Sequence, residues 1–290
     1  MEFDHIKIAR FFNKLSQFGA FEFEKTFDPE PYLAFAANNY AIPIVAIALY
    51  LCFCFGVRSL MEGHKAFDLQ MPLALWNALL SFFSFLGMCR TVPHLLSRLL
   101  SEPFQQTICS NPRLSWGKGT TGLWVMLFIF SKLPELVDTV FIVLRKRPLI
   151  FLHWYHHVTV LFFCWNAYAT LAATGLYFVA MNYSVHALMY GYYCLTALNM
   201  CPKSFPTILI TMSQILQMFV GTGVCATAWY YWHQKIPCNN DITNLCCGGV
   251  MYGSYLYLFT AFAFKRYSPK GPKSASGESG KPDKKVEKED

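Results

Sequence analysis

Long apolar stretches separated by short polar breaks restrict what this chain of 290 residues can fold into. Hydrophobic residues make up 54% of the sequence and charged residues only 14%, whereas a soluble domain has about 25% charged residues. The hydrocarbon core of a bilayer is about 30 Å thick and requires roughly 20 helical residues for each crossing. Because backbone polar groups must be satisfied internally in lipid, such stretches predict helices. We therefore expect an all-α integral membrane protein.

We expect seven transmembrane helices, because breaker pairs such as Asn111-Pro112 and Cys201-Pro202 separate the apolar stretches. The predicted spans are residues 39–57, 69–89, 122–144, 149–168, 171–195, 205–229 and 245–264. Only a short stretch around Thr170 parts the fourth and fifth spans, which predicts a tight helical hairpin. No internal repeat is visible, so one membrane domain over residues 39–266 is the simplest organisation.

The two ends of the chain differ from this domain in composition. Residues 1–38 mix charged and aromatic side chains and lack the pattern of a cleaved signal peptide, so we expect a membrane-surface segment. Residues 267–290 are rich in Lys, Ser, Gly, Pro and Glu, which predicts a disordered tail. More Lys and Arg residues fall on the side of the tail than on the opposite side, which predicts a cytosolic tail and an N-terminus across the membrane.

Three histidines stand at the start of the fourth predicted span, within the sequence Phe-Leu-His-Trp-Tyr-His-His of residues 151–157. The i, i+3, i+4 spacing of His153, His156 and His157 places them on one helical face. His186 lies within the fifth span. Burying several imidazoles among apolar side chains is costly unless the site uses them. Histidines that are merely satisfied in the core are the alternative, but the clustering favours four catalytic candidates.

Three charged residues, Lys132, Glu135 and Asp138, interrupt the third predicted span. Their spacing keeps neighbours in contact, so Lys132 can compensate the charge of Glu135. Charges at this depth face a bundle interior or an aqueous cavity. A buried ion pair that only locks helices together is the competing interpretation. Asp138 is also placed to orient a histidine of the next helix, as carboxylates near a functional imidazole often do.

Polar residues also form stripes on the fifth and sixth spans. Asn182, His186 and Tyr190 recur at i, i+4 and i+8, and Gln214 and Gln217 share a face of the sixth span. Polar side chains can simply hold membrane helices together. Because these stripes accompany the histidines, we expect one shared polar chamber.

Three functions compete for a membrane protein with clustered histidines. A membrane di-iron desaturase or hydroxylase needs more histidine ligands than converge here, because only four of the 8 histidines are placed together. A zinc site of three histidines and a water is numerically feasible, but no carboxylate and water arrangement recommends it. A transporter would show inverted repeats and broken helices at the bilayer midplane, and the sequence shows neither sign.

Five ordered motifs resemble those of the ELO-type very-long-chain fatty acid elongases. They are Lys132-x-x-Glu135-x-x-Asp138-Thr139, Leu144-Arg145-Lys146-Arg147-Pro148-Leu149, Phe151-Leu152-His153-Trp154-Tyr155-His156-His157, Met181-Asn182-Tyr183-x-x-His186-x-x-Met189-Tyr190 and Thr211-x-x-Gln214-x-x-Gln217. The resemblance implies a seven-helix enzyme of the endoplasmic reticulum membrane, with a central acyl tunnel, a lumenal N-terminus and a cytosolic C-terminus.

The same resemblance implies a reaction. An acyl-CoA condenses with malonyl-CoA to a 3-oxoacyl-CoA two carbons longer, with release of CO2 and CoA, as the first step of fatty acid elongation. No metal or redox cofactor is implied. The implied partners are the two CoA substrates, membrane lipid, and a ketoreductase, a dehydratase and an enoyl reductase; no nucleic acid is involved, and a homo-oligomer is left open. Tunnel depth would act as the ruler of acyl length.

The residues supply what such a condensation needs. Imidazoles offer a base or nucleophile near neutral pH, while Asn182, Tyr190, Gln214 and Gln217 are candidate donors to an enolate or thioester oxygen. The candidate ligands of the CoA phosphates are Arg145, Lys146, Arg147, Lys203, Lys265 and Arg266. Ordinary positive-inside anchoring is an equally good explanation of these basic residues.

The mechanism has two open routes, a ternary complex or an acyl-enzyme formed before malonyl-CoA binds. By resemblance to the family, we expect His156 to attack the thioester with His186 beside it, and His153 and His157 to position the pair. Cys164 lies two helical turns deeper and is expected to line the tunnel.

Most of the 11 cysteines fall within spans as small apolar residues. Cys109 and Cys238 instead fall in loops on the side away from the tail, which is oxidising in the endoplasmic reticulum. Two unrelated loop thiols would fit the sequence equally well. The family resemblance supports a disulfide between them, which we predict.

Overall fold

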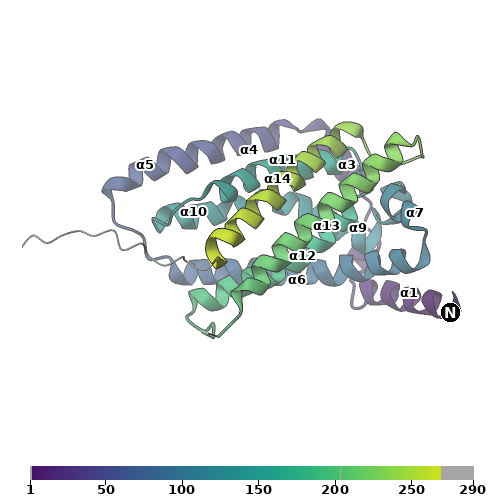
Figure 1. The fold of residues 1–290 in the computed structure, drawn as a ribbon, viewed down its shortest axis with the longest axis horizontal. Helices are drawn as coiled ribbons and strands as arrows, with labels where there is room; N and C mark the ends of the chain where they lie inside the picture. Colours follow the sequence, from purple (N-terminus) through teal and green to yellow (C-terminus); the bar gives the residue numbers. More distant parts are fainter. Residues whose placement is uncertain (1, 203, 269–290) are drawn as a thin grey trace, which may run out of the picture.

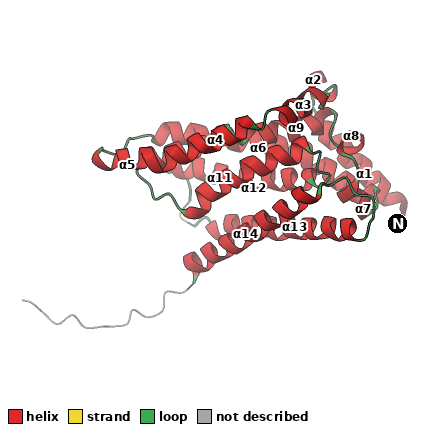
Figure 2. Cartoon of the chain, turned by 90° about the horizontal axis from the view of Figure 1, so that it is seen from above, coloured by secondary structure: helices red, strands yellow, loops and turns green. Residues whose placement is uncertain are grey.

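The computed structural model describes residues 2–202 and 204–268, and these residues form an elongated bundle of helices without a β-strand (Figures 1 and 2). The all-α prediction is thus confirmed. Within this described part, four helical segments are long and apolar enough to cross a membrane: Ala41–Gly63, which includes α4 (Ala41–Cys52), α6 (Gln70–Ser101), α13 (Thr207–His233) and α14 (Ile242–Tyr267).

The outer surface of these helices is apolar, as a lipid-facing surface must be. Large side chains remain exposed along α6 and α13, among them Leu75, Phe82, Leu216 and Phe219. Long apolar helices with apolar outer faces make this a multi-pass membrane protein.

The third predicted span is not one continuous helix. α9 (Gly119–Ser131) and α10 (Val137–Leu144) are separated by a 3-10 turn at Pro134–Leu136. Pro134 explains the break, because proline lacks an N–H group and its ring clashes with the preceding helical turn. The sequence prediction of a single helix over residues 122–144 was therefore wrong in this detail.

The predicted helical hairpin is present. α11 (Phe151–Ala169) and α12 (Gly175–Ala197) are joined by a short turn in which Leu171 adopts a positive φ of 53°. α12 packs closely on α6, where Gly87 leaves room for the Tyr183 ring; a Cβ atom at Gly87 would lie 2.4 Å from that ring. α11 and α12 carry the four histidines of the predicted site and are not among the four long apolar segments.

The N-terminal segment packs on the bundle. α1 (Glu2–Gln17) lies along the later part of α6, where the Ser97 hydroxyl donates a 2.8 Å hydrogen bond to the Ala9 carbonyl. Trp165 of α11 donates from Nε1 to the carbonyl of Ala36 in α3 (Glu30–Asn38) at 2.9 Å. The predicted disordered tail lies outside the described residues beyond Ser268.

A disulfide joins the short helix α7 (Phe104–Cys109) to the loop that follows α13. Its partners are Cys109 and Cys238, the pair expected from the family resemblance. The Asn239 amide donates to the Cys109 carbonyl at 2.9 Å beside it. The link therefore ties together the far ends of α6 and α13.

Candidate active site

A cavity of about 730 Å³ lies between α6, α10, α11, α12, α13 and α14. One end of the cavity lies where α6 starts and where α12 and α14 end. Gln70, Ala197 and Phe262 line it there. Most of the predicted site residues line this cavity: Glu135, Asp138, Arg145, Arg147, His153, His156, His157, Asn182, His186, Tyr190, Gln214 and Gln217. The predicted polar residues therefore share one cavity, and residues from all five motifs meet in it.

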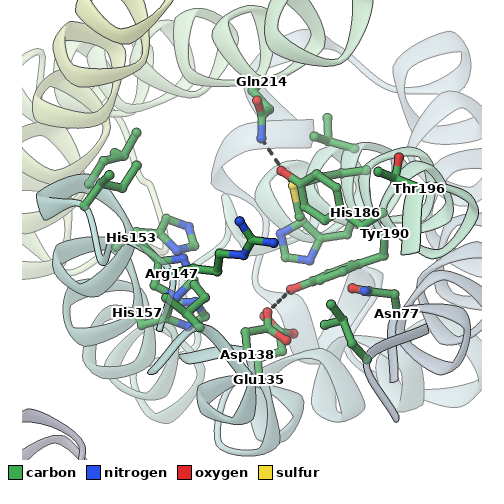
Figure 3. Close-up of a pocket in the computed structure, with 18 of the residues that line it drawn as sticks. Asn77, Glu135, Asp138, Arg147, His153, His157, His186, Tyr190, Thr196 and Gln214 are labelled. Carbon is green, nitrogen blue, oxygen red and sulfur yellow. Dashed lines mark hydrogen bonds between the residues drawn. The ribbon is translucent and has the colours of Figure 1, made fainter. Parts of the chain in front are cut away.

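The four histidines face the cavity from the two helices of the hairpin (Figure 3). On α11, the ring centroids of His153 and His157 are 4.5 Å apart, and those of His156 and His157 are 5.6 Å apart. On α12, His186 stands perpendicular to the Tyr190 ring at a centroid distance of 5.2 Å. His157 and His186 are buried. The i, i+3, i+4 pattern thus produces one imidazole cluster with a fourth ring on the neighbouring helix.

Asp138 lies differently from the expectation that it orients a histidine. Its Oδ1 accepts a 2.6 Å hydrogen bond from Trp76 Nε1, and its Oδ2 accepts one of the same length from the Tyr190 hydroxyl. The neighbouring Thr139 is the residue that contacts a histidine, with Oγ1 2.9 Å from His153 Nε2. Consecutive helical residues point in directions about 100° apart, since a turn takes 3.6 residues. Only one of the two can therefore face α11.

Lys132 and Glu135 form the buried ion pair that their spacing predicted. Lys132 Nζ lies 2.7 and 2.9 Å from the two carboxylate oxygens and sits over the Phe128 ring. It also donates to Asn182 Oδ1 at 3.3 Å. Because the Asn182 oxygen faces Lys132, the amide NH2 group is turned away from the ion pair and can donate to a ligand. The pair locks α12 to the turn after α9, while Glu135 also lines the cavity, so both interpretations of these charges are met.

Two basic side chains line the cavity, Arg147, which is exposed, and Arg145, which is half-buried. Figure 3 shows the Arg147 guanidinium between His153 and His186. Lys146 turns away, since its backbone has a positive φ of 53°. Its Nζ instead donates to the carbonyl oxygens of two residues in the segment before α6, Glu62 at 3.2 Å and His64 at 3.1 Å. Lys146 is thus separated from the two arginines beside it.

The other predicted basic ligands lie at the edge of the site or beyond it. The Arg266 guanidinium packs over the ring of Phe262, which lines the cavity, at 6.0 Å. Lys265 is exposed at the end of α14. Lys203 lies outside the described residues.

Several residues of the site were not predicted. Asn77 and Gln70 of α6 line the cavity, and Gln70 donates to the Ala197 carbonyl across its mouth at 2.7 Å. The Tyr255 hydroxyl of α14 donates to the His156 carbonyl at 3.2 Å, and its ring lies 5.1 Å from the His156 ring. Asn77 could have been found, because an amide inside an apolar span is itself a signal. The tyrosine carries no such signal.

Beyond the histidines the bundle is filled by aromatic rings. Phe178 and Tyr252 stack at a centroid distance of 4.7 Å, and Gly221 makes room for the Tyr252 ring, which a Cβ atom would approach to 2.4 Å. Cys164 is buried in this apolar core and is not among the lining residues, contrary to the expectation that it lines a tunnel. Phe178 and Tyr252 are not among the residues that line the cavity. Among the described residues, three or more His, Cys, Asp or Glu side chains in metal-site arrangement are not found.

Comparison with known proteins shows the family of this chain. Residues 35–275 match the model of the ELO family, described as the GNS1/SUR4 family. The chain belongs to the ELO family. It is 40% identical over 255 residues to very long chain fatty acid elongase 6 of Gallus gallus, with 88% of this chain and 95% of the relative covered. It is 38% identical over 258 residues to the elongase 6 of Homo sapiens, covering 89% and 96%.

A third relative extends the similarity. The chain is 40% identical over 252 residues to the putative fatty acid elongase 3 of Caenorhabditis elegans, which covers 86% of this chain and 77% of the relative. All five motifs fall within the residues matched to the ELO family. The family resemblance is therefore confirmed, and membership of the ELO family does not favour a desaturase or a transporter.

Proposed function

We propose that this ELO-family chain condenses a long-chain acyl-CoA with malonyl-CoA to a 3-oxoacyl-CoA two carbons longer, releasing CO2 and CoA. The observation that carries the proposal is the cavity bordered by His153, His156, His157 and His186 in a chain whose relatives are named fatty acid elongases. The apolar surroundings suit an acyl chain, and the imidazoles suit acyl transfer.

The first chemical step is acyl transfer to His156. The lone pair of the neutral imidazole attacks the thioester carbonyl, the C–S bond breaks, and the CoA thiolate leaves as free CoA after protonation. His186, which faces the same cavity, serves as the proton donor and acceptor. The acyl-imidazole keeps the driving force of the thioester, so exclusion of water is essential. The tightly packed aromatic layer beneath the histidines supports that exclusion.

The second step joins the two carbon units. Malonyl-CoA loses CO2, and the resulting enolate attacks the acyl carbon. The C–N bond to His156 breaks, and a proton delivered through His186 restores the neutral imidazole. The enolate oxygen needs hydrogen-bond donors that are already in place. Asn182, Gln214, Gln217 and Tyr190 line the cavity and are the candidates for this role. The step requires neither a metal nor a redox cofactor.

Arg145 and Arg147 are placed to bind the phosphates of CoA. Both line the cavity near its wide end, and arginine pairs with phosphate through two parallel N–H groups. In Figure 3 the guanidinium of Arg147 lies between His153 and His186, so a phosphate bound to it would bring the substrate close to the histidines. Arg266 and Lys265, at the end of α14, are the outer candidates; Lys146 is occupied elsewhere.

We place the enzyme in the endoplasmic reticulum membrane with seven crossings, a lumenal N-terminus and a cytosolic tail. Four long helices account for four crossings, and the broken α9–α10 unit, α11 and α12 would supply three more. The Cys109–Cys238 disulfide supports this orientation, because it lies at the ends of α6 and α13 that are remote from the cavity mouth. Disulfides belong to the oxidising lumen, and CoA substrates would then enter from the cytosol.

The product defines the functional partners. A 3-oxoacyl-CoA carries a ketone that must be reduced, dehydrated and reduced again before another round of elongation. A ketoreductase, a dehydratase and an enoyl reductase are therefore the enzymes expected to consume it.

The direct test is condensation by the purified protein in lipid nanodiscs. Acyl-CoAs of graded length and unsaturation are incubated with isotopically labelled malonyl-CoA, and products are read by mass. The proposal expects a 3-oxoacyl-CoA containing two labelled carbons, absent from the His156→Ala protein. A folded preparation of this protein in nanodiscs that makes no such product from any acyl-CoA would contradict the proposal.

A further inference from the structure

A chain of two hydroxyl groups connects α4 to the histidine cluster. The Tyr50 hydroxyl lies 2.8 Å from Thr139 Oγ1, and the same Thr139 oxygen lies 2.9 Å from His153 Nε2. Thr139 is fully buried and Tyr50 is 5% exposed. The three residues come from three different helices, and Tyr50 lies in the first predicted span, outside all five motifs.

The number of protons in this hydrogen-bond chain determines which ring nitrogen of His153 is protonated. A buried tyrosine hydroxyl needs an acceptor for its proton, and Thr139 Oγ1 is in place to accept it. A threonine hydroxyl has a single proton, which Thr139 can then donate to His153 Nε2. Because Nε2 is the acceptor in this arrangement, the proton of the neutral imidazole is on Nδ1. His153 would thus offer an N–H donor to a ligand in the cavity.

The same residues fix where the rings stand. The Tyr50 ring centroid lies 6.0 Å from that of His157, and His157 in turn lies 4.5 Å from His153. Tyr50 is therefore linked to the cluster in two ways: its hydroxyl acts through Thr139, and its ring packs beside His157. Tyr50→Phe removes the hydroxyl and keeps the ring packing, so it separates the two contributions.

We propose that Thr139 and Tyr50 are positioning residues for the condensation, holding His153 in one orientation and one tautomer. The proposal rests on the function proposed above for this cavity. Neither residue touches the substrate; Thr139 acts through His153, and Tyr50 acts through Thr139. Partners that orient a functional imidazole in this way typically change activity about 10- to 100-fold when they are removed.

The test compares Thr139→Val, which keeps the side-chain shape and removes the hydroxyl, with Thr139→Ser, which restores a hydroxyl. Tyr50→Phe and the Tyr50→Phe/Thr139→Val double variant complete the set. A matched control exists at the other end of the bundle, where Thr107 Oγ1 lies 2.6 Å from the Tyr177 hydroxyl and both residues are buried. Thr107→Val thus breaks an equivalent buried pair away from the cavity. For each protein, kcat, KM, the pH profile of kcat and thermal unfolding are measured.

We expect Thr139→Val to lower kcat about 10- to 100-fold with little change in KM, and Thr139→Ser to recover most of it. Thr139→Val should also displace the pH profile of kcat, while Thr107→Val leaves kcat and the profile unchanged even where it lowers the unfolding temperature. Since Tyr50 acts through Thr139, adding Tyr50→Phe to Thr139→Val should cost nothing further in kcat.

Two results would overturn the proposal. One is a Thr139→Val protein with wild-type kcat and pH profile. The other is a double variant whose losses in kcat multiply, which would show that Tyr50 acts independently. These outcomes require an active wild-type protein, so they are distinct from failure of the proposed function, in which the wild type itself forms no 3-oxoacyl-CoA.

Discussion

Tyr190 donates a 2.6 Å hydrogen bond to the Asp138 carboxylate and places its ring perpendicular to that of His186. Trp76 of α6 occupies the other carboxylate oxygen at 2.6 Å. One half-buried acid thus joins α6, α10 and α12 and fixes the aromatic ring against which a site histidine stands. The carboxylate acts on the cavity through the tyrosine rather than on an imidazole directly.

Replacing Tyr190 by phenylalanine isolates this hydrogen bond. The ring that packs on His186 remains, while Asp138 Oδ2 loses its partner. A typical intramolecular hydrogen bond contributes about 0.5–1.5 kcal/mol, so we expect a lower unfolding temperature together with a lower kcat. Tyr190→Phe combined with Asp138→Asn should be less destabilised than Tyr190→Phe alone, because the charge left behind is gone. Equal unfolding temperatures for Tyr190→Phe and the wild type would contradict this assignment.

Replacing one partner of the buried Lys132–Glu135 ion pair should lower the stability of the fold. Lys132 is 2% exposed and Glu135 is 4% exposed. Lys132→Met leaves an uncompensated carboxylate in the bundle, which typically costs 3–5 kcal/mol. Glu135→Gln added to Lys132→Met should recover part of the stability, as measured by thermal unfolding in detergent. Activity need not return, because Glu135 also lines the cavity. A double variant less stable than Lys132→Met would refute the pairing.

Adjacent basic residues should differ in their effect on substrate binding. Arg147 points into the cavity, whereas Lys146 donates to backbone carbonyl groups of the segment before α6. Losing a hydrogen bond to a charged group costs about 1.5–3 kcal/mol. Arg147→Ala should therefore raise the KM for acyl-CoA about tenfold or more, and higher salt should reduce the difference from wild type. Lys146→Ala is the matched control and should leave KM unchanged. The reverse order of effects would show that Lys146 binds the CoA phosphates.

The long apolar helices and the histidine face were predictable because both depend on local periodicity. The cluster of His153, His156 and His157 follows directly from helical spacing. The Pro134 break was missed because charges and apolar residues on both sides fit one helix equally well. The partners Tyr50, Trp76 and Tyr255 were missed for a different reason. They come from helices outside the motifs, and only the packing of the bundle brings them to the site.

The different directions of the Asp138 and Thr139 side chains show the same limit at the scale of one residue. Both belong to one motif, and the acid is the more obvious partner for an imidazole. Which of them faces α11 depends on how α10 is rotated after the proline turn. Such a rotation is set by tertiary packing and is not encoded in the spacing of a single helix.

The N-terminal segment offers a test of stability against pH. The Glu24 carboxylate is buried beside Arg90, and Trp124 Nε1 donates to it at 2.9 Å. Burial opposes the charged form, but the hydrogen bonds from Trp124 and the Phe21 amide and the charge of Arg90 outweigh it. They hold the pKa of Glu24 below its ordinary value of 4.5. A carboxyl with a depressed pKa stabilises the fold above its unfolded pKa, and that contribution is lost as the pH falls through the folded pKa.

We therefore expect the unfolding temperature of the wild type to fall more steeply below pH 4.5 than that of Glu24→Gln, which has no such proton to bind. Above that pH the variant should be the less stable of the two. Glu22→Gln provides the control, because Glu22 is exposed and its partner Lys25 lies on the same short helix. Parallel curves for the wild type and Glu24→Gln throughout the acidic range would remove this interpretation.

Acyl transfer to His156 is tested most directly by incubating the purified protein with acyl-CoA in the absence of malonyl-CoA. Intact mass and release of free CoA are recorded for the wild type, His156→Ala and Cys164→Ser. The mechanism predicts one acyl group per chain with an equal amount of CoA released, both retained in Cys164→Ser and both lost in His156→Ala. Unimpaired condensation by His156→Ala, or acyl labelling that disappears only in Cys164→Ser, would contradict it.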